Sequence, residues 1–115
     1  MDQVADVDIE SDGVYKYILI KVSDKKSSAS KMVVRGYSWA DYHADILDRV
    51  SPKFHRLGLT YECLGGGRID HNSRDKLIKI YGYSVGFGQA DHKLTREILS
   101  KHYPDCEITC SNAGY

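Results

Sequence analysis

The segment Val14–Val22 constrains the fold of this chain more than any other part of its sequence. Its apolar residues fall on both alternating faces of an expected strand: Val14, Ile18, Ile20 and Val22 on one face, Tyr15, Tyr17 and Leu19 on the other. A strand whose two faces are both apolar has to be covered on both sides. We therefore expect this strand inside a sheet with a further layer on each face.

Two segments have the helical pattern that such layers need. Apolar residues recur with a period close to 3.6 between Trp39 and Leu57, where Pro52 predicts a kink or a fresh turn. Gly58 is placed to end this helix. A second helix is expected over Asp91–His102. Together with the strands, the pattern predicts one sheet with two helices, in an α+β or mixed α/β arrangement.

The other expected strands are short and separated by turn residues. They are placed at Met32–Arg35, Leu59–Leu64, Ile69–His71, Leu77–Ser84 and Cys106–Ser111. The strands Ile69–His71 and Leu77–Ser84 are expected to form a hairpin around residues 72–75. Residues 23–31 are polar and are expected to form a loop. The first twelve residues contain five acids and no base, and are expected to form a solvated arm or an edge segment.

Composition excludes several classes of protein. A chain of 115 residues has room for one domain, which we expect to span residues 1–115. Lys plus Arg equals Asp plus Glu, 16 each, so the chain lacks the basic excess of a general nucleic-acid-binding protein. The longest apolar run, Tyr17–Ile20, is too short for a membrane span, and the N-terminus has no signal-peptide pattern. Three cysteines without a CxxC pair indicate reduced thiols and a cytoplasmic protein.

His43 is the unusual residue of the first helix because its imidazole falls within the apolar stripe. Such a histidine is either a satisfied structural residue or a functional one. Ser38 and Asp41 are both candidate N-caps of this helix. If Asp41 is the cap, unpaired N–H groups beside His43 form a site for an anion; if Ser38 is the cap, most of those groups are already used.

Three further features have the chemistry of an anion site. Lys16 shares a strand face with apolar residues, so its ammonium group either reaches solvent at the strand end or is directed at an anion. The run Tyr81–Gly88 joins a strand to a helix, and its glycines allow backbone N–H groups to converge on an anion or simply form a tight turn. Arg68 follows three glycines and either contacts a phosphate or pairs with a surface acid.

Several common catalytic centres have no counterpart in the sequence. The histidines show no HExxH or HxH spacing, and no carboxylate or thiol set has the spacing of metal ligands. GxSxG is absent, and no cysteine precedes a phosphate-binding loop that ends in arginine. A metal centre, a serine hydrolase and a cysteine phosphatase are therefore not expected.

Four motifs in order along the chain resemble the 14 kDa phosphohistidine phosphatase, or Janus, family. They are Ser11–Tyr17, Arg35–Tyr37 with Trp39–Ile46, Cys63–Ile69 and Tyr81–Ser84. Pro104–Asp105 and the closing Asn112–Tyr115 are similar as well. The resemblance implies a six-stranded mixed sheet with two helices and a monomer without metal or cofactor. It also implies hydrolysis of the N–P bond of phosphohistidine in proteins, with phospholysine as a further substrate class.

The resemblance also implies roles for individual residues. His43 is implied as the catalytic histidine, with an unprotonated ring that acts as a general base or attacks phosphorus itself. The implied substrate-binding residues are Lys16, Ala44, Arg68, Ser84, Val85 and Gly86. Because Ala44 would act through its backbone N–H group, this favours Asp41 as the helix cap.

Two other functions remain open at the level of sequence. A Janus paralogue could bind phosphorylated partners with little turnover, in sex-specific or germline differentiation. A nucleic-acid- or peptide-binding module could instead use the nine tyrosines, but it would need a basic stripe, of which the balanced charge gives no sign.

Overall fold

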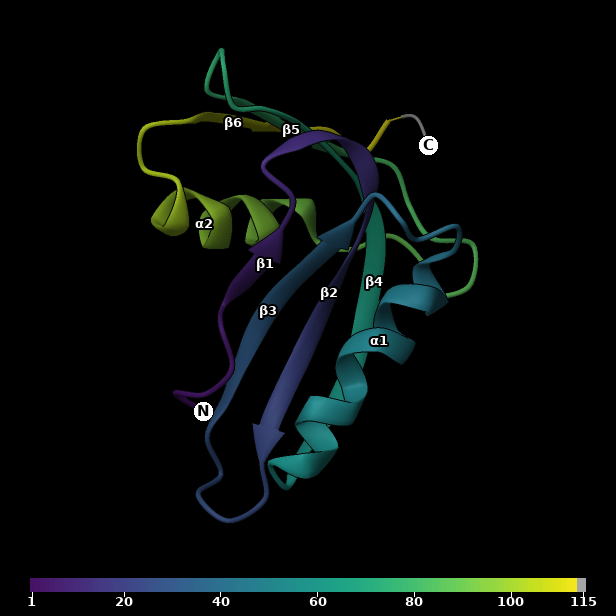
Figure 1. Cartoon of the computed structure of the whole chain (residues 1–115), viewed down its shortest axis with the longest axis vertical. Helices are drawn as coiled ribbons and strands as arrows, with labels where there is room; N and C mark the ends of the chain where they lie inside the picture. Colours follow the sequence, from purple (N-terminus) through teal and green to yellow (C-terminus); the bar gives the residue numbers. More distant parts are fainter. Residues whose placement is uncertain (114–115) are drawn as a thin grey trace.

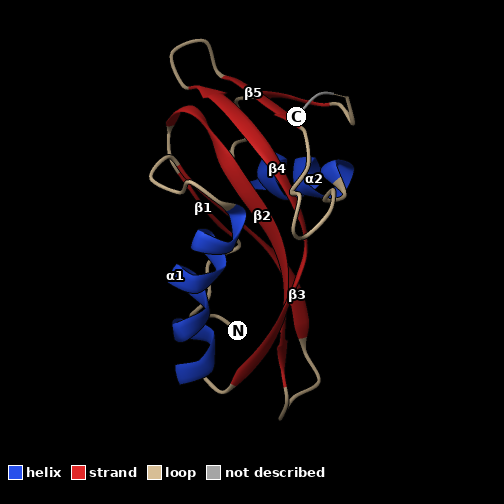
Figure 2. Cartoon of the chain, turned by 90° about the vertical axis from the view of Figure 1, so that its right-hand side faces the viewer, coloured by secondary structure: helices blue, strands red, loops and turns tan. Residues whose placement is uncertain are grey.

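A computed structural model describes residues 1–113 as one mixed six-stranded sheet with two helices (Figure 1). The strands are β1 (Val7–Ile9), β2 (Asp12–Asp24), β3 (Ser30–Tyr37), β4 (Leu59–Asn72), β5 (Leu77–Tyr81) and β6 (Glu107–Cys110). Their order in the sheet is β1-β3-β2-β4-β5-β6; the two outer pairs are parallel and the inner pairs antiparallel. The helices, α1 (His43–Arg56) and α2 (His92–His102), lie on opposite faces of the sheet (Figure 2). The expected α+β fold is confirmed; Gly114 and Tyr115 of the closing motif lie outside the described residues.

Strand β2 lies inside the sheet, between β3 and β4, as its two apolar faces predict. Ile18, Ile20 and Val22 are fully buried in the core beneath α1, which also contains Ile46 and Phe54 of that helix. On the other face, Tyr17 and Leu19 are fully buried in a second core that contains Leu99 of α2. Lys16 shares the α1 face with Ile18 because side chains alternate along a strand.

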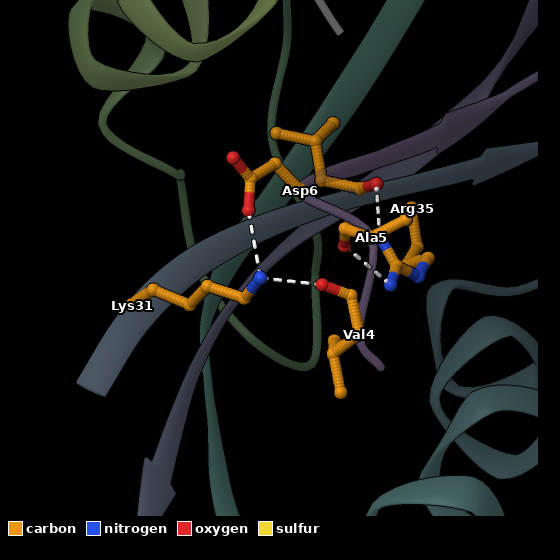
Figure 3. Close-up of polar contacts among 6 residues, drawn as sticks. Val4, Ala5, Asp6, Lys31 and Arg35 are labelled. Carbon is orange, nitrogen blue, oxygen red and sulfur yellow. Dashed lines mark hydrogen bonds and ion pairs between the residues drawn. The ribbon is translucent and has the colours of Figure 1, made fainter. Parts of the chain in front are cut away.

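The six strands are not all the ones expected from the sequence. The acidic N-terminal segment forms the edge strand β1, which confirms the second of the two forms expected for it. The segments 59–64 and 69–71, by contrast, are one continuous strand, β4. The N-terminal segment is held by side chains of β3: Lys31 pairs with Asp6 at 2.9 Å, and Arg35 donates to the carbonyl of Ala5 at 2.8 Å (Figure 3). These cross-strand partners are why a run with five acids still joins the sheet.

Strand β4 continues through Gly65, Gly66 and Gly67 because other parts of the chain approach its backbone closely. A Cβ atom at Gly65 would lie 2.6 Å from the backbone nitrogen of Ala90. The pairing of β4 with β2 also shifts register here, between Leu19 and Ile20. Close approach and a bulge, the two explanations for a glycine run, therefore both apply.

Helix α1 begins four residues later than the sequence pattern predicts, at His43. Trp39 instead stacks on Tyr37, with ring centroids 5.2 Å apart, and the guanidinium of Arg49 lies 4.4 Å from the Trp39 ring. These contacts hold Trp39 outside the helix. Pro52 lies within α1, which continues to Arg56, so the helix does not start a fresh turn there.

The other local predictions agree closely with the structure. Gly58 follows α1 with φ of +72°, a conformation suited to glycine. Asp91 caps α2 by accepting a hydrogen bond from the N–H of Leu94 at 3.2 Å. The hairpin between β4 and β5 turns at residues 73–76, and the polar loop is a short turn at residues 25–29. Cys63, Cys106 and Cys110 are all unpaired.

Candidate active site

A cavity of about 620 Å³ opens where α1 begins and the loop after β5 passes in front of the sheet. Its lining comes from β2, from α1 and the residues just before it, and from that loop. These residues are Lys16, Asp41, Tyr42, His43, Ala44, Ser84, Val85, Gly86 and Phe87. The cavity thus contains all the expected site residues except Arg68.

The N-cap of α1 is Tyr42, so both caps expected from the sequence are wrong. The carboxylate of Asp45 accepts a hydrogen bond from the Tyr42 N–H at 2.9 Å, as the third helical residue does in a capping box. Ser38 is unavailable because Glu10 accepts hydrogen bonds from its backbone N–H and its hydroxyl. His43 and Ala44 are the first two helical residues, and N–H groups at these positions have no partner within a helix. Their N–H groups and the helix dipole favour an anion there.

The ring of His43 is fixed by the glycine run of β4. Its Nε2 atom lies 2.9 Å from the carbonyl oxygen of Gly67. Since a carbonyl only accepts, Nε2 carries the proton in the neutral ring and Nδ1 keeps a lone pair. A Cβ atom at Gly66 would lie 2.6 Å from Cδ2 of the same ring. Glycine at that position is therefore what allows the imidazole to lie against the sheet.

The environment of His43 favours the neutral ring. Burial is the largest cause that lowers its pKa, and the positive charges of Lys16 and Arg68 lower it further. The hydrogen bond to Gly67 acts in the opposite direction but does not reverse the net shift. His43 is therefore unprotonated at neutral pH, which leaves Nδ1 able to accept a proton or to act as a nucleophile.

Lys16 and Arg68 are direct cross-strand neighbours in the sheet. Lys16 pairs with Tyr37 on β3 and with Arg68 on β4, and Arg68 pairs with Tyr81 on β5. Directly opposed residues direct their side chains to the same face, so all four lie on the α1 face. Lys16 lines the cavity, whereas Arg68 does not and acts on the site through its charge.

The loop after β5 presents backbone donors to the cavity. Ser84 and Gly88 exchange backbone hydrogen bonds at 3.0 and 2.8 Å, and the Ser84 hydroxyl accepts from the N–H of Phe87 at 3.0 Å. Within residues 1–113, no acceptor is bonded to the N–H groups of Val85 and Gly86. Val85 is 81% exposed at the rim. The loop can therefore offer two N–H donors and the Ser84 hydroxyl hydrogen to one anion.

A sequence model of the Janus/Ocnus family matches residues 1–107 of the chain. The chain belongs to the Janus/Ocnus family. It is 51% identical over 117 residues to the 14 kDa phosphohistidine phosphatase of Homo sapiens, covering 97% of this chain and 94% of that protein. It is 50% identical to the phosphatase of the same name from Sus scrofa, with 98% and 94% covered. It is also 52% identical to the sex-regulated protein janus-A of Drosophila yakuba, with 95% and 80% covered.

Three contributions to the site of this Janus/Ocnus chain were missed from the sequence. Tyr42 forms the cap and the rim, 71% exposed, and Phe87 lines the cavity. The Gly67 carbonyl orients His43. An acidic residue three positions after Tyr42 is a capping-box signal that could have located the helix start. No local signal relates Gly67 to His43, because 24 residues separate them.

Two negative findings apply to residues 1–113 of the Janus/Ocnus chain. No group of three or more histidine, cysteine or acidic side chains in this part is arranged to hold a metal ion. Neither of its two helices has the length and apolar character needed to cross a bilayer.

Proposed function

We propose that this protein hydrolyses the N–P bond of phosphohistidine, and of phospholysine, in other proteins. One observation carries the proposal: the His43 ring, with Nδ1 unprotonated, lies in one cavity with Lys16 and with backbone N–H groups that can hold a phosphoryl group. The named phosphohistidine phosphatases among the relatives support it, since they match nearly the whole chain.

The phosphoryl oxygens are bound by donors from three parts of the chain. The N–H of Ala44 at the start of α1 and the N–H groups of Val85 and Gly86 surround the cavity, and the Ser84 hydroxyl adds a fourth donor. Lys16 supplies a full positive charge at the same place. Fixed donors of this kind stabilise the charge that spreads over the phosphoryl oxygens in the transition state. Arg68 adds to the positive potential from its place beside Lys16.

The reaction needs one bond to form at phosphorus and one to break. A water oxygen attacks phosphorus in line with the leaving imidazole, and Nδ1 of His43 takes the proton that the water gives up. The other nitrogen of the substrate ring is first protonated by solvent. The P–N bond then breaks, its electron pair goes to the substrate ring, and the ring leaves as neutral imidazole. The products are inorganic phosphate and an unmodified histidine.

A second route uses the same atom of His43. Nδ1 attacks phosphorus, the substrate histidine leaves, and water then hydrolyses the phosphorylated His43. Both routes need the neutral ring, and both use the tautomer set by Gly67. The N–P bond of phosphohistidine is labile in acid, so the reaction cannot be stopped with acid. Rapid alkaline denaturation of the enzyme during turnover of labelled substrate distinguishes the two routes. Label retained on wild-type protein but not on His43→Ala supports the covalent route.

The cysteines and the charge of the chain bear on its cellular setting. We propose a cytoplasmic monomer without metal or cofactor whose partners are phosphohistidine-containing proteins. The three unpaired thiols support a reducing compartment. The balanced charge supports a protein rather than a nucleic acid as the partner.

The janus-A relatives support a second candidate function. Their name describes them as sex-regulated, and they match 95% of this chain. The alternative is a protein that binds phosphorylated partners in sex-specific or germline differentiation with little turnover. The intact set of Lys16, His43 and Ser84 favours the enzyme, because binding alone does not need an unprotonated histidine beside the phosphate.

The deciding experiment measures phosphate release from a phosphohistidine peptide, in the presence of a chelator. We compare wild type with His43→Ala, after circular dichroism has shown both to be folded. The proposal expects turnover by wild type that survives the chelator and is lost in the variant. A folded but inactive wild type that still binds the peptide supports the binding function. Activity retained by His43→Ala means that another residue carries the reaction.

A further inference from the structure

A basic groove lies between α1 and the strands β1 and β3, away from the loop that closes the catalytic cavity. It has a volume of about 370 Å³. Five of its residues matter here: Arg35, Tyr37, Arg49, Lys53 and Arg56. The only acid in its lining is Asp8, which gives the groove a positive excess in a chain with no net charge.

One wall of the groove is a basic stripe along α1. Arg49, Lys53 and Arg56 are spaced four and three residues apart, so they fall on the same side of the helix. All three are exposed. In the part of the chain that the structure describes, none of them lies within ion-pair distance of a carboxylate. The stripe that the balanced composition concealed is thus present on one helix face.

Two acids beside the stripe are already engaged. Asp8 accepts a hydrogen bond from the hydroxyl of Tyr37 at 2.7 Å. Asp45, one turn before Arg49, accepts the N–H of Tyr42. Neither carboxylate is paired with a cation of the stripe, so the positive charge of the groove remains available to a ligand.

The floor of the groove adds a buried guanidinium. Arg35 is 6% exposed, and its donors reach the backbone carbonyls of Val34 and Ala5 at 3.0 and 2.8 Å rather than a carboxylate (Figure 3). Backbone carbonyls accept from its N–H groups, and the nearby Asp8 and Asp6 carboxylates stabilise its charge without forming an ion pair with it in the described part of the chain. At the end of the groove nearest the start of α1, Arg49 lies over Trp39, which stacks on Tyr37.

The groove begins beside the catalytic cavity. Tyr37 lines the groove and is the direct cross-strand neighbour of Lys16, which lines the cavity. Their side chains lie on the same face of the sheet. A chain that places a phosphohistidine at Lys16 can therefore continue past Tyr37 and along α1.

We propose that this groove binds an acidic segment next to the phosphohistidine in the protein substrate. The inference rests on the proposed function, and it names the substrate class. Arg49 and Arg56 are seven positions apart, which corresponds to roughly 10 Å along the helix axis. Acidic side chains on alternate residues of an extended peptide are about 7 Å apart, so two or three of them match the stripe.

A protein segment fits this groove better than a nucleic acid does. Nucleic-acid binding relies on many phosphate contacts and a basic excess over a wide surface. Here the positive charges are confined to one groove, and the whole chain is neutral. The continuity with a cavity that holds Lys16 and His43 also favours one peptide that occupies both sites.

The first test measures binding without catalysis. The probe is a fluorescent, unphosphorylated histidine peptide with aspartates at three alternate positions, compared with the same peptide carrying serines. Each exposed ion pair changes a binding constant about two- to five-fold. Arg49→Gln, Lys53→Gln and Arg56→Gln together should therefore raise the Kd of the acidic peptide at least about eight-fold. The serine peptide should bind wild type and variant equally weakly.

A matched control removes the same charge elsewhere. Lys93, Arg96 and Lys101 are exposed on α2, which lies on the other face of the sheet. Their combined change to glutamine should leave the Kd of the acidic peptide within two-fold of wild type. Equal weakening by both triple variants overturns the proposal, because net charge alone would then explain binding. A single-stranded RNA of equal charge that binds the same groove more tightly also overturns it.

Hydrolysis separates this inference from the proposed function. With phosphohistidine versions of both peptides, wild type should show a lower KM for the acidic peptide at equal kcat, and the α1 variant should lose that preference. Hydrolysis of both peptides with equal KM overturns the groove and leaves the phosphatase intact. Hydrolysis of neither peptide, with acidic-peptide binding lost only in the α1 variant, supports the groove and overturns the enzyme.

Discussion

Gly66→Ala is the perturbation that most directly tests how the ring of His43, the proposed catalytic residue, is positioned. The added Cβ would lie 2.6 Å from Cδ2 of His43 and 2.8 Å from the backbone oxygen of Tyr17. Carbon atoms in contact are normally about 3.5 to 4.0 Å apart, so the ring has to move by about 1 Å. A displacement of that size at a reacting group costs up to about a hundred-fold in rate. Overpacking against β2 should also lower the free energy of unfolding by about 1 to 3 kcal/mol.

The assay for Gly66→Ala measures kcat on a phosphohistidine peptide together with urea unfolding. Gly58→Ala is a suitable control for lost stability. Gly58 has φ of +72° at the end of α1, and nothing lies within 4 Å of an added Cβ. Alanine in that conformation costs about 1 to 2 kcal/mol. The control should therefore unfold more easily yet keep the wild-type kcat.

The reasoning is refuted if folded Gly66→Ala retains the wild-type kcat. A loss of activity shared by Gly58→Ala would equally refute it, because general destabilisation would then be the cause. A KM that rises alone would show that binding of the phosphoryl group, rather than the position of His43, depends on Gly66.

Three further predictions concern charge and capping at the site. First, kcat/KM should fall as the pH drops through the folded-state pKa of His43, which lies below its ordinary value of 6.5; a pH profile with its acid limb above 6.5 would contradict this. Second, Lys16→Met removes a positive charge that lowers this pKa, so the His43 titration followed by NMR should move to higher pH, with a loss of phosphate binding; an unmoved midpoint would mean that the two groups are not coupled. Third, Asp45→Ala leaves the Tyr42 N–H without its carboxylate and should lower the free energy of unfolding by about 1 kcal/mol in urea titrations, whereas an unchanged midpoint and slope would show that the cap contributes nothing.

Local patterns were enough to predict much of the fold. The alternation along Val14–Val22 predicted a strand covered on both sides, and it placed Lys16 on the same face as Ile18. The helical period of α1 identified His43 as an imidazole within an apolar stripe, and it is 6% exposed. These predictions succeed because side-chain direction follows backbone periodicity over short distances.

Local patterns failed or left alternatives open where distant contacts compete with them. The helical period extended back to Trp39, but stacking on Tyr37 and Arg49 holds Trp39 outside α1. The acidic N-terminal segment was compatible with a solvated arm or an edge segment, and its contacts with Lys31 and β3 make it the edge strand β1. In both cases, tertiary contacts decide the outcome because the local preference is weak.

The sequence by itself singled out several residues that the structure brings together in one cavity. Lys16, His43, Ser84 and the neighbouring glycines were all identified from their positions in expected strands, helices and turns. Only the tertiary structure decided their chemistry. The carbonyl of Gly67, 24 residues from His43, selects the tautomer, and Tyr42 rather than Asp41 or Ser38 frees the helix N–H groups. Hydrogen-bond direction and burial depend on atoms brought together from separate strands, and no local pattern specifies those distances.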